Sequence, residues 1–212
     1  MIRNSFYNKD YFEKGKISKK SCYENYRWIP ELTIPMATKI VKYCNFGENQ
    51  SILDFGCSKG YLVKSLRLLG YKAYGVDISK YAIENTDTEV KKYCKLIKDN
   101  YAPIKKNFSW VLSKDVLEHM TYHQISKFLT TYRKFCKQMF HVIPLGDKNK
   151  YRIKEYHLDK SHVQMNNEAW WIKTFKNNGW ETIKFDYAVK GIKDNWHDHH
   201  PKGNGFFTII KK

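Results

Sequence analysis

A short segment that contains two acids and a histidine, "DVLEH" at 115–119, is suited to proton transfer or metal binding. Asp115, Glu118 and His119 are spaced i, i+3 and i+4, so a helix would present them on one face. A histidine that titrates near neutral pH can take a proton from a reacting hydroxyl. Together with His162 in "KSHV", the same residues offer oxygen and imidazole ligands for a divalent cation such as Mg²⁺ or Mn²⁺.

A second segment, "ILDFGCSKGYL" at 52–62, joins a short apolar run to a turn of small residues and the start of a helix. Such a turn lets backbone N–H groups and the positive end of the helix approach a phosphate or a nucleoside closely. The dinucleotide fingerprint places an apolar residue two positions before its first glycine, whereas here Asp54 precedes Gly56. The turn therefore disfavours an NAD-dependent oxidoreductase.

Alternating strands and helices are expected to position these two segments. Strands that alternate with helices indicate a parallel sheet covered on both faces, and two final strands without a helix between them indicate an antiparallel strand. Ser79 is the expected N-cap of its helix, and a long polar loop joins the last two strands. The expected helices cover 31–44, 60–69, 79–86, 122–136 and 166–179, and the strands cover 51–55, 72–77, 93–97, 108–113, 138–144, 181–189 and 205–212.

The turn after the first strand also carries a family pattern. Asp54, Gly56, Ser58 and Gly60 read D-x-G-x-(small)-x-G, which resembles motif I of class I S-adenosylmethionine-dependent methyltransferases. The resemblance continues from about residue 50 through nearly the whole chain. It implies an α/β Rossmann-like methyltransferase fold: a mostly parallel seven-stranded sheet with an antiparallel last strand and helices on both faces. It also implies a helical lead-in or lid over 1–50, a methyltransferase domain over 51–212, and S-adenosyl-L-methionine as cofactor.

The resemblance carries over roles for individual residues. Asp54 would help to organise the methionine end, Asp77 would hold the ribose hydroxyls, and Asp99 would accept from the adenine amino group. Ser58 departs from the family pattern, because it adds a Cβ where the backbone approaches the ligand; Ser109 stands where the fourth strand often opens with aspartate. The expected cofactor-binding residues are Asp54, Gly56, Ser58, Gly60, Asp77, Ile78, Asp99, Asn100 and Lys114.

Two further segments, "FSWVLSKDVLEHM" at 108–120 and "HLDKSHVQMNNEAWWIKTFKNNGWE" at 157–181, resemble segments of small-molecule methyltransferases. This resemblance implies O-methylation of a small-molecule or sugar-like acceptor. His119 is then the expected general base, with Glu118 and His162 as further catalytic residues. The set Asp115, Glu118, His119 and His162 is also similar to the metal site of small-RNA 2′-O-methyltransferases, whose motif is E-x-x-E-H with a distant histidine. The first acid here is the shorter aspartate, so the metal-free mechanism is favoured and a metal-assisted reaction on RNA is the alternative.

The charge of the chain bears on its partners. Lysine and arginine number 38 against 21 acidic residues, a formal net charge of +17, which could attract a polyanion such as RNA. The lysines are spread along the whole chain, however, and phosphate recognition favours clustered arginine. A nucleic-acid acceptor is therefore the alternative to a small-molecule or glycan acceptor. A methyltransferase-like domain that binds without catalysis is a third interpretation.

The remaining features concern location and accessory contacts. No apolar run approaches the ~20 residues that a membrane span needs, so we expect no span and a cytoplasmic protein. The five scattered cysteines are expected to be reduced thiols. We expect the histidine tract 197–200 to be mostly solvated, on a loop that faces the substrate. In the aromatic lead-in, Tyr11, Tyr26 or Arg27 could reach the substrate or the methionine carboxylate.

Overall fold

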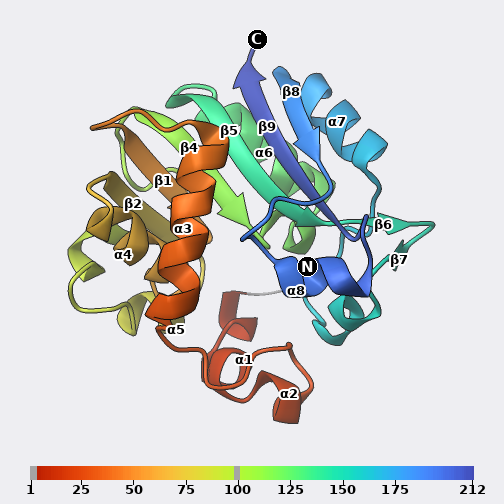
Figure 1. Ribbon diagram of the computed structural model, residues 1–212. Coiled ribbons are helices and arrows are strands. Elements are labelled where there is room, and N and C mark those ends of the chain that lie inside the picture. The colour runs from red at the N-terminus through yellow and green to blue at the C-terminus, as the bar shows by residue number, and fades with distance from the viewer. Residues whose placement is uncertain (1–3, 98–100) are drawn as a thin grey trace.

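The centre of the molecule is a seven-stranded sheet in the order β3-β2-β1-β4-β5-β9-β8 (Figure 1). The structure is a computed structural model that describes residues 4–97 and 101–212. The first five strands run parallel, and β9 runs antiparallel to both β5 and β8. The predicted fold class is therefore confirmed. The strands are β1 (Ser51–Phe55), β2 (Lys72–Asp77), β3 (Cys94–Leu96), β4 (Phe108–Lys114), β5 (Cys136–Pro144), β8 (Trp180–Asp186) and β9 (Asn204–Lys211).

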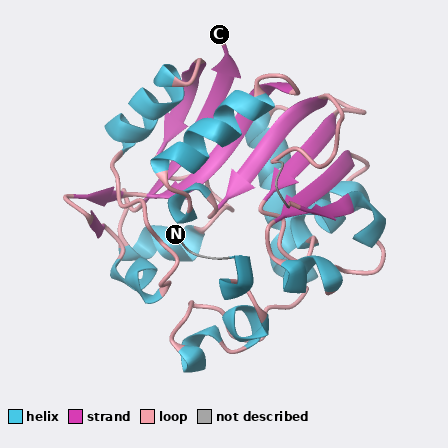
Figure 2. Ribbon diagram, turned by 180° about the vertical axis from the view of Figure 1, so that it is seen from behind, coloured by secondary structure: helices cyan, strands magenta, loops and turns pink. Residues whose placement is uncertain are grey.

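Helices cover both faces of this sheet, as Figures 1 and 2 show. Adjacent strand residues such as Ile52 and Leu53 point to opposite faces, and both are fully buried. Ile52 packs with α3 (Pro30–Cys44) and α4 (Tyr61–Leu68), whereas Leu53 packs with α6 (Tyr122–Tyr132) and α7 (Glu168–Asn177). The central strands thus read as continuous apolar runs because water reaches neither face.

Most predicted elements are present, with shifts at their ends. Ser79 caps α5 (Lys80–Glu84) by accepting from the backbone N–H of Ala82, as predicted. The helix predicted over 122–136 ends at Tyr132, and Cys136 already pairs with Phe108 as the first residue of β5. That prediction was wrong at its end because Phe135 and Cys136 are apolar, and apolar residues fit a helix or a buried strand equally well.

Three kinds of element in the described residues were not predicted from the sequence. The polar loop between β8 and β9 includes α8 (Asp194–His199). A hairpin of β6 (Gly146–Asp147) and β7 (Lys150–Tyr151) follows β5, and its two-residue strands are too short to show a period. Short 3₁₀ segments lie at Asn4–Phe6, Lys91–Tyr93, Leu117–His119 and Lys154–Leu158.

The N-terminal segment lies at the carboxyl ends of the parallel strands (Figure 1). It includes α1 (Lys9–Glu13) and α2 (Gly15–Ser18), followed by a stretch over 19–29 without helix. The segment is less helical than expected because six of its aromatic residues pack on one another and on α5 rather than along one helix. Tyr11 and Phe12 are the buried centre of this cluster. The Ser79 hydroxyl donates to the carbonyl of Tyr7 at 2.6 Å and ties the segment to the end of β2.

Two further expectations concern the whole chain. Among the described residues, none of the helices combines the length and apolar character that crossing a bilayer requires. All five cysteines are free thiols, as predicted, and four of them are buried.

Candidate active site

A cavity of about 560 Å³ opens at the carboxyl ends of β1 and β4. One wall is the turn after β1, the floor is the segment after β4, and the N-terminal segment forms the opposite wall. Loops before α7 and before β9 complete it. The lining includes Tyr11, Tyr23, Tyr26, Arg27, Asp54, Gly56, Ser58, Lys114, Asp115, Glu118, His119, Tyr156, Asp159, His162, Lys193 and Trp196.

The turn after β1 presents three of the predicted cofactor residues to this cavity. Gly56 has a φ of +85°, and a Cβ there would lie 2.4 Å from a methyl group of Val116, so only glycine fits the turn. Ser58 adopts a φ of 50°, and its buried hydroxyl has no hydrogen-bond partner among the described residues. Burial, together with the charge of Asp77, raises the pKa of Asp54 to about 7. This wall therefore offers an unpaired hydroxyl and a carboxyl that a cationic ligand would ionise.

The other predicted cofactor residues are placed differently. Asp77 ends β2 and accepts from the backbone N–H groups of Ser58 and Ser79, both at 2.7 Å. Asp77, Ile78 and Gly60 do not line the cavity, and Gly60 is instead the left-handed N-cap of α4. The predicted residues Asp99 and Asn100 lie outside the described residues.

Asp115 follows β4 and is held between two lysines. Lys114 Nζ lies 2.6 Å from the carboxylate, and Lys193 from the loop before α8 ion-pairs with its other oxygen. Burial would raise the pKa of Asp115, but the two ammonium groups outweigh burial and hold that pKa below its usual range. Asp115 has a φ of 56°, and the 3₁₀ segment begins only at Leu117. The prediction that Asp115, Glu118 and His119 share a helical face was therefore wrong, because a left-handed residue interrupts the helix.

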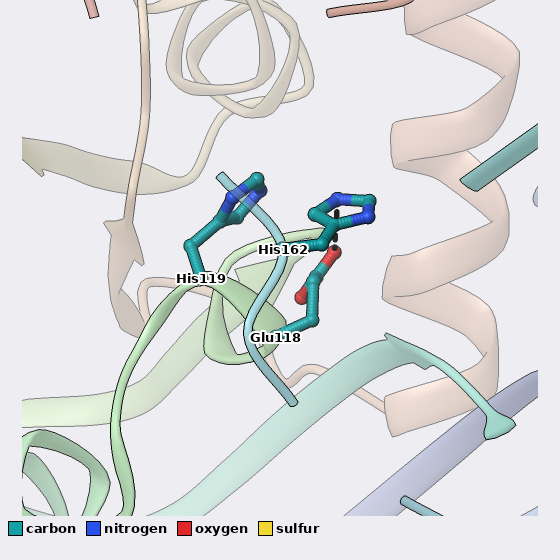
Figure 3. Close-up of side chains that lie close together, drawn as sticks. All are labelled: Glu118, His119 and His162. Atoms are coloured by element: carbon teal, nitrogen blue, oxygen red, sulfur yellow. Dashed lines mark ion pairs between the residues drawn. The ribbon is translucent and has the colours of Figure 1, made fainter. Parts of the chain in front are cut away.

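Glu118, His119 and His162 come together on the floor of the cavity (Figure 3). The first two project from the 3₁₀ segment, and His162 comes from the loop before α7. The backbone N–H groups of Val163 and Gln164 both donate to the carbonyl of Glu118, at 2.8 and 3.0 Å, and so fix His162 beside it. His162 Nε2 lies 3.9 Å from Glu118 Oε1, and the two imidazole centroids are 4.5 Å apart.

Burial controls the protonation of this cluster. Glu118 is fully buried, and burial together with the charge of Asp115 raises its pKa well above the usual range. Burial lowers the pKa of His119 and, with the neighbouring His119, lowers that of His162 to about 4. At neutral pH the imidazoles are therefore uncharged, and the contact between Glu118 and His162 is not an ion pair.

Hydrogen bonds define which ring nitrogen of each histidine carries the proton. His162 Nδ1 lies 2.7 Å from the carbonyl of Tyr156, which can only accept, so Nδ1 donates. His119 Nδ1 lies 2.7 Å from the Ser161 hydroxyl, which donates its own proton to Asp159 and so accepts from His119. In both neutral rings the lone pair is consequently on Nε2.

The histidine tract at 197–200 does not form a comparable cluster. His199 Nδ1 lies 3.2 Å from Glu155, and the side chains of both are more than two-fifths exposed. Over 4–97 and 101–212, only Glu118, His119 and His162 place three ligand atoms of histidine, cysteine or acidic residues close enough to hold one ion. Trp196 of α8 and the preceding Lys193 do line the cavity, and a position facing the substrate stays a prediction.

Several residues of the site were not predicted from the sequence. Asp159 is 7% exposed and also accepts from the Tyr11 hydroxyl at 2.6 Å. Trp196 stacks on Tyr156 with a centroid separation of 4.8 Å, and Lys193 Nζ lies 4.8 Å from the Tyr156 ring. The aspartate two residues before Ser161 in "HLDKSH" was a usable signal for Asp159, since an acid there can orient a nearby histidine.

A family model for a methyltransferase domain matches residues 36–185, which is 150 of the 212 residues. The chain belongs to this methyltransferase family. It is a class I S-adenosylmethionine-dependent methyltransferase, as motif I predicted, and S-adenosylmethionine is its cofactor. No curated protein matches the chain in sequence.

Solved structures support the fold of this methyltransferase. Magnesium protoporphyrin IX methyltransferase (ChlM) from Synechocystis PCC 6803, with bound SAH, is similar with a TM-score of 0.61 and 14% identity over 85% of this chain and 82% of that one. An S-adenosylmethionine-dependent methyltransferase from Clostridium acetobutylicum ATCC 824 is similar with a TM-score of 0.63 and 12% identity, over 84% of this chain and 92% of that one. The mitomycin 7-O-methyltransferase MmcR is similar with a TM-score of 0.58 and 11% identity; the match covers 85% of this chain but only 54% of MmcR. At these identities the similarity shows the fold alone.

Proposed function

We propose that this methyltransferase transfers a methyl group to a hydroxyl oxygen of a small-molecule or sugar-like acceptor. The observation that carries the proposal is that one cavity joins the motif I turn to a cluster of proton acceptors. Its volume of about 560 Å³ suits a compact acceptor beside the methionine end of the cofactor. The similar mitomycin 7-O-methyltransferase also carries oxygen methylation in its name.

The charges around the cavity favour a small acceptor over a polyanion. The overall charge of +17 does not gather there, because the lining has four cationic residues against five acidic ones. Two of the four cations, Lys114 and Lys193, are already paired with Asp115. The lining charges are Lys16, Arg27, Lys114 and Lys193 against Glu24, Asp54, Asp115, Glu118 and Asp159.

The cofactor supplies a methyl group on a positively charged sulfonium, already activated for in-line displacement. In our proposal Asp54 faces the cationic methionine end, and the backbone around Gly56 and Ser58 packs against it. The raised pKa of Asp54 and the unpaired Ser58 hydroxyl support this placement, because both groups would gain a partner. Lys114 lies at the same wall. Gly60, Asp77, Ile78, Asp99 and Asn100 remain predicted contacts for the rest of the cofactor.

The N-terminal 50 residues are proposed to act as a lid over the domain formed by residues 51–212. Tyr11, Tyr26 and Arg27 line the cavity opposite motif I. Glu13 reaches across to ion-pair with Lys59 in the motif I turn and accepts from the Tyr81 hydroxyl at 3.0 Å. These contacts would exclude water from the cavity once the cofactor and acceptor are in place.

The proton of the acceptor would leave through the Glu118, His119 and His162 cluster. The His119 Nε2 lone pair is the proposed general base, because Ser161 and Asp159 hold the ring with its proton on Nδ1. The new bond joins the methyl carbon to the acceptor oxygen as the carbon–sulfur bond breaks, and the hydroxyl proton goes to Nε2. His162 and Glu118 support the ring from the floor of the cavity.

Labelled S-adenosylmethionine incubated with the protein and a cell extract tests the acceptor class. We expect label in the low-mass fraction, on an oxygen atom by mass spectrometry. The variant His119→Gln should reduce kcat by about 10²- to 10⁴-fold with unchanged cofactor affinity. The matched change His123→Gln, on an exposed histidine of α6, should leave turnover unchanged. Label found mainly in protein or RNA would contradict the proposal.

Calorimetry of cofactor binding tests the predicted role of Asp77. Replacing it by alanine should weaken binding by about 1–3 kcal/mol, as expected for a charge-assisted hydrogen bond to the ribose. Because Asp77 also holds the backbone of Ser58 and Ser79, circular dichroism must first show that the variant is folded. Asp87→Ala is the control, since Asp87 is paired with Lys64 and does not line the cavity. Unchanged affinity in a folded Asp77→Ala protein would remove Asp77 from the cofactor site.

RNA is the second candidate acceptor, favoured by the net charge of +17 and by the cluster of possible metal ligands Glu118, His119 and His162. Phosphate contacts release counterions, so productive RNA binding should weaken steeply between low and physiological salt. Labelled RNA in the extract experiment, lost as salt rises, would establish this second function in place of the first.

A further inference from the structure

The Glu118 carboxyl is without a hydrogen-bond partner in the part of the chain that the structure describes. The side chain is fully buried, and neither of its oxygens has a hydrogen-bond partner among the described residues. Burying a polar group without a partner costs free energy, so native proteins seldom leave one in that state. Figure 3 shows the carboxyl pointing toward the ring of His162. The group is therefore aimed at a position where something else could bind.

Both histidines beside Glu118 are oriented as metal ligands usually are. A ligating imidazole donates its second N–H to a carbonyl or a carboxylate, which leaves the other nitrogen for the metal. His162 donates Nδ1–H to the carbonyl of Tyr156. His119 donates Nδ1–H to Ser161, which passes a hydrogen bond on to Asp159. Two independent networks thus leave an Nε2 lone pair on each ring.

The spacing of the three groups also suits one ion. One ligand atom from each of Glu118, His119 and His162 lies within 4.8 Å of the other two. Ligands around a first-row transition metal at about 2.0–2.2 Å lie roughly 3–4 Å from one another. Small side-chain rotations would close that difference without moving the backbone.

We propose that Glu118, His119 and His162 bind one divalent transition-metal cation on the floor of the cavity. Two imidazoles and one carboxylate favour Mn²⁺, Fe²⁺, Co²⁺ or Zn²⁺ over Mg²⁺, which prefers oxygen ligands. Asp115 is not a ligand in this site, because Lys114 and Lys193 already neutralise it. Three protein ligands leave open positions that face the cavity.

The inference rests on the proposed function and deepens it. An acceptor hydroxyl bound at an open position would have a lowered pKa and would release its proton to water. The cation would then replace His119 as the means of deprotonation. The methyl group would still pass from sulfur to the same oxygen, so the acceptor class is unchanged.

Metal binding can be measured without cofactor or acceptor. The protein is first treated with a chelator and then titrated with Co²⁺, whose visible absorption reports imidazole ligation, and bound metal is counted by mass spectrometry. We expect one Co²⁺ per chain. Glu118→Gln, which keeps the shape and removes the anionic ligand, should weaken binding by at least about 100-fold, as should His162→Gln. His199→Ala should leave binding unchanged, because His199 lies in the exposed tract.

The outcomes separate this inference from the proposed function. No saturable binding, or binding that survives Glu118→Gln and disappears in His199→Ala, would overturn the metal site. Methyl transfer to a small molecule that persists fully in chelator would also overturn it, while leaving the proposed function in place. Stoichiometric metal binding with label only in RNA would support the metal site and overturn the small-molecule acceptor.

Discussion

Two clusters, each with one carboxyl group, lie on the same floor of the cavity and hold these groups in opposite ways. Asp115 is paired by Lys114 and Lys193, so its charge is neutralised within the fold. Glu118, three residues later, is buried without any partner for its oxygens among the described residues. The pKa of Asp115 is lowered and that of Glu118 is raised. We expect the first cluster to stabilise the fold and the second to bind a ligand.

The difference originates in the backbone after β4. The left-handed φ of Asp115 separates this residue from the 3₁₀ segment that carries Glu118 and His119. The loop with Lys193 then reaches Asp115, while the loop with His162 reaches Glu118. We therefore expect separate roles for two residues that look equivalent in sequence, structural for Asp115 and chemical for Glu118.

The largest expected effect comes from breaking the paired cluster. Asp115→Ala should lower the free energy of unfolding by about 3 kcal/mol, because it leaves the nearly buried ammonium of Lys193 without its carboxylate. Urea unfolding of the chelated protein measures the change. Asp10→Ala is the control, since its contact with Lys20 is exposed and worth about 0–1 kcal/mol. Equal losses of unfolding free energy in the two variants would show that the ion pairs of Asp115 stabilise the fold no more than an exposed ion pair does.

A smaller effect is expected from loosening the unpaired cluster at a distance. Asp159→Asn weakens the acceptor that holds Ser161 and, through it, the ring of His119. Because Asp159 is a positioning residue, the substitution should change Co²⁺ affinity by about 10- to 100-fold and alter the absorption spectrum of the bound metal. Spectroscopic titration of the two proteins measures both.

The control for Asp159 is Tyr11→Phe, which removes only the tyrosine hydroxyl that donates to the same carboxylate. It should leave Co²⁺ affinity within about threefold, because the link through Ser161 to His119 is intact. If the tyrosine variant loses as much affinity as Asp159→Asn, the carboxylate acts on the N-terminal segment and not on His119.

The sequence predicted the fold well because its signals are local. Apolar strand runs, the Ser79 cap and the D-x-G-x-(small)-x-G turn each depend on neighbouring residues, and each appears in the structure. The seven-stranded sheet followed from the family resemblance, and its antiparallel strand also from the absence of a helix between β8 and β9 in the predicted pattern. The short helix α8 escaped detection because its six residues carry no apolar period.

The site was only partly predictable, because its contacts join distant segments. Glu118, His119 and His162 were identified by residue type, but nothing local indicated that Asp115 would be taken by Lys193, 78 residues later. The role of Asp159 likewise depends on a hydrogen-bond chain to His119, 40 positions away in sequence. Such pairings are decided by how loops cross the end of the sheet, which sequence periodicity does not record.

Measured per pH unit, the smallest expected effect is a difference in pH dependence between the two acids. In metal-free protein the folded pKa of Glu118 lies above its unfolded value, so the native state keeps a proton that the unfolded chain loses above about pH 4.5. The stability that this protonation gives is full below the unfolded pKa and is lost as pH rises through the folded one. Wild-type protein should therefore lose stability relative to Glu118→Gln by up to about 1.4 kcal/mol per pH unit above pH 4.5.

Asp115 gives the opposite sign and serves as the internal comparison. Its folded pKa is depressed, so its stabilisation is present above the unfolded pKa near 3.8 and is lost as pH falls below it. Urea unfolding in chelator, between about pH 5 and pH 7, gives the free energy of unfolding of wild type, Glu118→Gln and Asp115→Asn. The difference from wild type should change with pH for Glu118→Gln and stay constant for Asp115→Asn. Added Mn²⁺ should abolish that change with pH, because a metal-bound Glu118 carboxylate no longer holds the proton. If the difference in unfolding free energy between Glu118→Gln and wild type does not change with pH in chelator, Glu118 is ionised in the native protein. The two clusters would then not differ in how they hold their carboxyl groups.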